Sequence, residues 1–209
     1  MHWRPETRHI AQHFIRRLGE GYLDRMEHDF KPTDGRWINN WNSHRVKLVT
    51  LAAAALNDDA MWSRARTQLI AHVGRNLRAD GSTIDFEERD ALHYVVYDLE
   101  PLVRTALAAR LRGENWLTVT GSSGGSIASA LDWLAPYARG EKPHEEFVHS
   151  RVKFDYQRRD AGLRGYSGAW DATLSSNLYA MATLLDPKYA VISQRLKPLN
   201  GWMAACWAR

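Results

Sequence analysis

Apolar residues recur at helical spacing along almost the whole chain. In the segment between Arg4 and Glu27 they fall on every fourth position, at Ile10, Phe14, Leu18, Tyr22 and Met26. Residues spaced in this way share one face of a helix, so the segment is expected to be amphipathic. A chain that buries such faces must pack helix against helix, which restricts the fold to a helical architecture.

The same spacing, with capping and turn residues between the segments, predicts six further helices. They are expected from Ser43, as the N-cap, to Leu56, and at about 60–77, 88–112, 126–139, 143–160 and 168–185. Short turns between helices of this length favour antiparallel pairs. The predicted fold is therefore all-α, with antiparallel helical hairpins that can curve into a toroid. Residues 1–209 are expected to form a single helical domain, with the Trp-rich end from Lys197 to Arg209 packing as a short terminal segment.

Composition limits the class of partner. The formal charge is +4 and the isoelectric point is about 9.3, which favours an acidic partner. No nucleic-acid-binding motif is present, and no apolar run approaches the roughly 20 residues of a membrane span. The start of the chain lacks a secretory apolar segment, and the single cysteine, Cys206, cannot form an internal disulfide. The histidines lack metal-ligand spacing, so we expect neither a metal nor a cofactor.

One group of candidate catalytic residues lies at the head of the second predicted helix. Asn42, Ser43 and His44 follow one another there. The positive end of a helix disfavours an imidazolium, so His44 is expected to be neutral near pH 7 and able to accept a proton. Trp37 and Trp41 flank this group and are candidates for stacking on sugar rings. The alternative is a plain helix cap with a surface histidine.

A second group follows the helical period between residues 89 and 100. Arg89, His93, Tyr97 and Glu100 are spaced by four, four and three residues and share one helix face. Tyr94 lies about 100° round the helix from His93 and can line the same cleft. Such a face is too polar for a plain core stripe, and a solvated face is the alternative.

These two segments resemble the alginate lyase family. The resemblance runs from about Trp37 to Tyr189, and it is strongest at Asn42-Ser43-His44 and at residues 91–102, ALHYVVYDLEPL. In that family an asparagine directly before a histidine opens one helix, and an arginine followed seven residues later by a tyrosine lies on another. The histidine corresponds to His44 and the tyrosine to Tyr94.

The chain departs from the family pattern in three ways. Ser43 stands directly before the histidine, so Asn42 is one residue further away. Position 87 is Glu87 where the family has arginine, and Arg89 is the expected substitute. Only about 40 residues precede the histidine helix, where family members carry a larger N-terminal half.

The resemblance implies an incomplete (α/α) toroid that cleaves a uronic-acid polymer, with alginate first, by metal-independent β-elimination. Asn42 and Arg89 would bind the uronate carboxylate, His44 or Tyr94 would take the proton, and Tyr94 would protonate the leaving oxygen. His93 and Tyr97 join the two tryptophans as substrate-binding candidates. The partner would be the anionic polysaccharide, with no nucleic acid or membrane, and the location would be periplasmic or secreted.

Two other functions remain open from the sequence. One is a non-catalytic polysaccharide-binding helical domain. The other is an α/α-toroid glycoside hydrolase that uses a carboxylate pair, Asp85 or Glu87 with Asp90 or Glu100. Unsaturated sugar ends, which absorb ultraviolet light, would distinguish the lyase from both.

Overall fold

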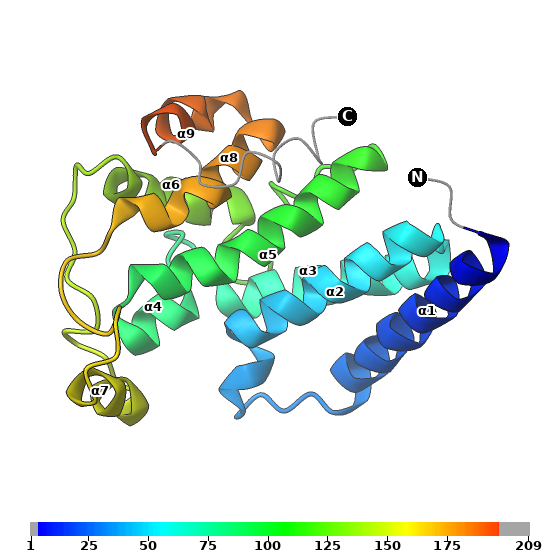
Figure 1. The fold of residues 1–209 in the computed structure, drawn as a ribbon, viewed down its shortest axis with the longest axis horizontal. Coiled ribbons are helices and arrows are strands. Elements are labelled where there is room, and N and C mark those ends of the chain that lie inside the picture. Colours follow the sequence, from blue (N-terminus) through cyan, green and yellow to red (C-terminus); the bar gives the residue numbers. More distant parts are fainter. Residues whose placement is uncertain (1–3, 197–209) are drawn as a thin grey trace.

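The computed structural model describes residues 4–196, and helices account for its architecture (Figure 1). Within that range the only extended pairings are two isolated bridges, Leu77 with Thr83 and Glu145 with Ala169. The predicted all-α class is therefore confirmed. The toroidal curvature and the single-domain organisation stay predictions.

The first three α-helices pack against one another. They are α1 (Pro5–His28), α2 (Asn40–Leu56) and α3 (Asp59–Asn76), with the short 3₁₀ helix η1 (Gly35–Trp37) before α2. Gly19 permits the close approach of α1, because a Cβ there would lie only 2.9 Å from the Ala52 Cβ and the Met61 sulfur. The predicted cap of α2 was wrong. Asn39 caps the helix by accepting from the Trp41 amide, and Ser43 lies inside its first turn.

The long helix expected from residue 88 to residue 112 is broken near its start. The structure has a short α4 (Ile84–Arg89) and a separate α5 (Leu92–Leu111). Asp90 between them adopts the left-handed conformation, with φ of 49°. Its carbonyl accepts from the Phe147 amide at 2.8 Å and its carboxylate accepts from the His149 amide at 2.9 Å. These long-range bonds stabilise the break, and no local sequence pattern reports them.

α5 is the central helix of the fold (Figure 1). It packs against α2, α4, α6 (Ile127–Ala138) and α8 (Ser176–Leu185), and Leu99, Leu102 and Val103 are fully buried. The predicted helix at 168–185 begins later than expected, with η2 (Ala172–Ser175) leading into α8. The described chain continues through η3 (Pro187–Tyr189) and α9 (Ala190–Leu196). The predicted packing of residues 197–209 lies outside the described residues.

The segment after α6 is mostly irregular. A helix was expected from 143 to 160, but only α7 (Lys153–Asp160) forms. The Glu146 amide donates to the Gly168 carbonyl at 2.9 Å, and the Arg151 amide donates to the Glu88 carbonyl at 2.7 Å. Because these backbone groups bond to distant segments, they do not form a helical ladder. The same bonds hold α7 near the start of α5.

Candidate active site

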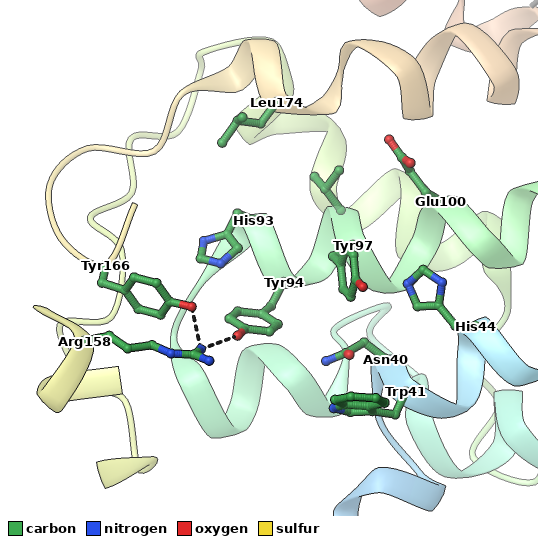
Figure 2. A pocket seen from close by; sticks show the side chains of 11 residues that line it. Asn40, Trp41, His44, His93, Tyr94, Tyr97, Glu100, Arg158, Tyr166 and Leu174 are labelled. Atoms are coloured by element: carbon green, nitrogen blue, oxygen red, sulfur yellow. Dashed lines mark hydrogen bonds between the residues drawn. The ribbon is translucent and has the colours of Figure 1, made fainter. Parts of the chain in front are cut away.

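A cavity of about 620 Å³ opens between α2, α5, α7 and the loops around α7 (Figure 2). Its walls include members of both groups of residues that the sequence singled out, together with others. The lining residues are Asn40, Trp41, His44, His93, Tyr94, Val96, Tyr97, Glu100, Arg158, Tyr166 and Leu174. The helix head at α2 and the polar face of α5 therefore share one cavity.

His44 lines the cavity from the second turn of α2. Its Nδ1 lies 3.3 Å from the Lys47 ammonium, and its buried Nε2 has no hydrogen-bond partner among the described residues. Burial, followed by the charges of Lys47 and Arg104, lowers the pKa of His44 to about 4. His44 is therefore neutral near pH 7, as expected. Burial is the largest cause of the lowered pKa, whereas the expectation from the sequence named the helix end.

Aromatic rings of α5 form one wall of the cavity. The Tyr97 ring lies beside His44, with ring centroids 4.5 Å apart, and the His93 and Tyr94 rings lie 4.6 Å apart (Figure 2). The Tyr97 side of the wall is open, since that residue is 53% exposed. All three residues were predicted from their spacing on one helix.

Arg158 of α7 brings a positive charge to the phenol of Tyr94. Its Nη1 donates to the Tyr94 hydroxyl oxygen at 3.3 Å and also to the Tyr166 hydroxyl oxygen (Figure 2). Burial and the neighbouring Tyr94 raise the pKa of Tyr166, so Tyr166 stays a neutral phenol. One end of the cavity thus holds the hydroxyl groups of Tyr94 and Tyr166, and both accept a hydrogen bond from Arg158.

Asn40 places its side-chain amide at the cavity. The Asp85 carboxylate of α4 accepts from the Asn40 backbone amide at 2.7 Å and from its side-chain nitrogen at 2.5 Å. Asp85 is fully buried, and burial raises its pKa to about 6 against the opposing effect of the Asn40 hydrogen bonds. The two bonds fix the orientation of the amide and join the starts of α2 and α4.

Asn42 lies in the protein interior and does not line the cavity. Its side-chain nitrogen lies 3.2 Å from Nδ1 of His72, and His72 Nε2 lies 2.6 Å from the Ser43 hydroxyl. Ser43 donates to Asp98, and Asn76 donates to the same carboxylate at 2.7 Å and 2.8 Å. We call Asn42, Ser43, His72, Asn76 and Asp98 the buried polar network; all five are at most 4% exposed.

Arg89 is likewise absent from the cavity lining. Its guanidinium pairs with the buried Asp155 carboxylate of α7 and lies 4.3 Å from the centre of the Tyr94 ring. Glu87, at the position of the family arginine, pairs with Arg78 at 2.7 Å. Arg89 therefore packs on the Tyr94 ring without lining the cavity, and the arginine that lines the cavity is Arg158.

The two candidate tryptophans differ in exposure. Trp41 lines the cavity and is 60% exposed, so one indole face is accessible to a ligand. Trp37 is only 6% exposed, and the Arg45 guanidinium lies 4.3 Å from the centre of its ring. Trp37 lines a second cavity of about 370 Å³ instead.

Sequence reasoning missed Asn40, Arg158 and Tyr166 as cavity residues. Asn40 stands two positions before Asn42, and only the true start of α2 would have identified it. Arg158 was visible only as part of a basic stretch, because its hydrogen bond to Tyr94 spans 64 residues. No local signal marked Tyr166.

The carboxylates proposed for a hydrolase are not gathered in the cavity. Of the four, only Glu100 lines it, where it pairs with Arg104 at 3.4 Å. Asp85 is buried against Asn40, and Asp90 stabilises the break before α5. In the described range, no three His, Cys, Asp or Glu side chains gather as a potential metal site.

Comparison with known proteins identifies the family. No curated protein matched the chain. The model of the family described as alginate lyase matches residues 1–144, which include α1, both predicted groups and the start of the loop that leads to α7. None of the helices between residues 4 and 196 combines the length and hydrophobicity needed to cross a membrane. Because the match covers more than half of the sequence, this chain belongs to the alginate lyase family.

Proposed function

We propose that the protein cleaves a uronic-acid polymer, with alginate as the first candidate, by β-elimination without a metal. Family membership indicates a polysaccharide lyase. The observation that carries the finer proposal is that His44 of α2 and Tyr94 of α5 line one cavity together with Arg158. The substrate, the bond-breaking chemistry and the residue roles are the parts of the proposal that need testing.

Hydrogen bonding to the uronate carboxylate is assigned to Asn40 and His44. The Lys47 ammonium can only donate, so the Nδ1 of His44 accepts and the neutral ring carries its proton on Nε2. That nitrogen has no protein partner among the described residues. A neutral Nε2–H is a donor, which makes His44 better suited to binding the carboxylate than to taking a proton. Each such contact contributes about 3 kcal/mol to stabilisation of the transition state.

Proton transfer is assigned to Tyr94. Arg158 donates to its hydroxyl oxygen, and the Arg89 guanidinium covers its ring. Both cations stabilise negative charge that develops on the phenol oxygen. Tyr166 bonds the same Arg158 nitrogen and orients it. General acid–base catalysis of this kind contributes about 10²- to 10⁴-fold.

The proposed step conserves atoms and charge. The Tyr94 phenolate takes the C5 proton of the uronate, and the electron pair of that C–H bond forms the C4–C5 double bond. The bond between C4 and the glycosidic oxygen breaks, and the leaving oxygen takes the proton back from Tyr94. The products are one new reducing end and one unsaturated end.

Glycoside hydrolysis is not favoured by the geometry. It needs two carboxyl groups about 5–10 Å apart on either side of the scissile bond. Glu100 is the only one of the four predicted carboxylates that lines the cavity, so the required pair is missing from the predicted set. A polysaccharide-binding domain without activity is the remaining alternative.

The proposed location is the periplasm or the outside of the cell. The family acts mainly on polysaccharides outside the cytoplasm, and an anionic polymer is too large to reach an enzyme inside it. Export can be measured by fractionating cells that express the full native gene. Retention of all the protein in the cytoplasm would contradict the proposed location.

The test of the catalytic proposal is Tyr94→Phe assayed against alginate and other polyuronates. We expect wild-type protein to generate ultraviolet-absorbing unsaturated ends and Tyr94→Phe to lose at least 10²-fold of that rate. The matched control is Tyr166→Phe, which removes a hydroxyl from the same end of the cavity and should keep at least a tenth of the rate.

Full activity in Tyr94→Phe would remove this residue from the mechanism. Binding of polyuronate by the wild type, with no product on long incubation, would support the non-catalytic alternative instead.

A further inference from the structure

Three cavities lie in a row across the start of α2. The proposed active-site cavity shares Trp41 and His44 with a neighbouring cavity of about 240 Å³. This neighbour shares Arg25 and Arg45 with the cavity of about 370 Å³ at the end of α1. Because adjacent cavities have wall residues in common, they lie side by side along α1 and α2, and we call this row the arginine groove beyond Trp41.

The far end of this groove carries more positive than negative side chains. Arg25, Lys31, Arg36 and Arg45 line it, with His28, and the opposing carboxylates are those of Asp29 and Asp34. Arg25 pairs with Asp29 at 3.3 Å through Nε, while its two terminal guanidinium nitrogens donate to no carboxylate of the described residues, and Arg36 pairs with Asp34 at 2.7 Å. Two of the four cations are therefore paired, while two lack a carboxylate partner among the described residues.

Arg45 is the central cation of the groove, since it lines both outer cavities. It is partly buried over the Trp37 ring, and one guanidinium nitrogen donates to the Arg36 carbonyl. No carboxylate of the described residues lies within ion-pair distance of it. Arg25 and Arg36 nearby add repulsion, and burial together with these charges lowers the pKa of Arg45. A bound anion would relieve that repulsion.

The path also suits a sugar polymer rather than a small anion. Trp41, 60% exposed, stands at the junction with the active-site cavity, and Tyr22 lines the middle cavity. Aromatic faces stack on sugar rings, while guanidinium groups form paired hydrogen bonds with carboxylates. Alternating aromatic and cationic walls therefore match a chain in which every ring bears a carboxylate.

We propose that the arginine groove beyond Trp41 binds further uronate units of the polymer held in the active-site cavity, with Arg45 and Arg25 as the carboxylate-binding residues. This proposal rests on the proposed function for its choice of ligand. It predicts that the enzyme favours long chains over oligosaccharides that fill the active-site cavity alone.

The experiment compares polyuronate with a uronate trimer as substrates for Arg25→Gln, Arg45→Gln and the double variant. We expect the ratio of kcat/KM for polymer to kcat/KM for trimer to fall about tenfold for each lost contact. The matched control is Arg8→Gln, which removes one positive charge from α1 at an exposed position that lines none of the three cavities. Its ratio should stay at the wild-type value.

Arg25→Gln is the variant expected to fold normally, because the Arg25 side chain is 65% exposed. A wild-type enzyme that degrades polymer, with an unchanged ratio in all three variants, would overturn the groove and leave the proposed function standing. If the wild type degrades no polyuronate, the proposed function fails, and polymer binding then decides the groove. If the double variant binds polyuronate more weakly than Arg8→Gln does, the proposed role of the groove is supported. If the two variants bind polyuronate equally, that role is overturned.

Discussion

Two histidines beside α2 have similar electrostatics and different surroundings. Burial lowers the pKa of His44 to about 4 and that of His72 to about 3, so both rings are neutral near pH 7. Both nitrogens of His72 meet side chains of the buried polar network, whereas Nε2 of His44 has no protein partner and its ring lines a cavity. A perturbed pKa therefore does not separate a structural histidine from a functional one. A place in the cavity lining and an unpaired ring nitrogen do.

Of the two histidines, His44 should matter more for activity, and His44→Gln should show it. Losing one donor to the substrate carboxylate is expected to lower kcat/KM about 10²- to 10³-fold. The folded state should survive, because the ring is only half-buried and its side-chain contact is with the partly buried Lys47. Initial rates of unsaturated-end formation measure the loss. A variant with more than half of wild-type activity would move His44 out of the active site.

Asp98→Ala should instead affect stability. It leaves the Ser43 hydroxyl and the Asn76 amide without their buried acceptor, which costs about 2 kcal/mol of unfolding free energy. Urea titration of both proteins measures this cost. Unchanged stability would show that the buried polar network is not a structural element.

The pH dependence of stability should report both histidines. Each has a folded-state pKa below its ordinary 6.5, so the unfolded chain binds the extra proton. The stability from each ring is fully present above about pH 6.5 and decreases as the pH falls to the folded-state pKa, about 4 for His44 and about 3 for His72. His44→Gln and His72→Gln should each flatten that slope by up to about 1.4 kcal/mol per pH unit. Urea titrations at a series of pH values test this, and a flattened slope in only one variant would contradict it.

Trp41→Ala should have the smallest effect. Loss of one exposed stacking surface is worth about 1 kcal/mol, or about a fivefold rise in KM for polymer. The matched change Trp37→Ala removes a buried ring. It should lower the free energy of unfolding more than Trp41→Ala does, and it should raise KM for polymer less. An unchanged KM in Trp41→Ala would remove the indole from substrate binding.

The sequence predicted those parts of the fold that depend on local periodicity. Helical spacing located α1, α2 and α3 to within a few residues. It failed at Asp90 and over residues 143–152, because their backbone groups bond to segments more than 20 residues away in the sequence. Such bonds leave no trace in a window of ten or twenty residues.

The same distinction applies to the candidate site. His93, Tyr94 and Tyr97 follow from the period of one helix, and all line the cavity. α2 begins at Asn40, three residues before the helix start expected from the sequence. With this earlier start, Asn40 lines the cavity and Asn42 lies in the interior, whereas the sequence had assigned Asn42 to the site. Arg158 comes from a helix whose position depends on tertiary contacts, and no spacing rule connects it with Tyr94.

The most direct test of the account counts two kinds of chain end in one reaction. Wild-type protein is incubated with polyuronate, and new reducing ends and new ultraviolet-absorbing ends are measured over time. The account predicts one unsaturated end for every reducing end, from β-elimination at the cavity shared by α2 and α5. Reducing ends that accumulate without ultraviolet absorbance would contradict it.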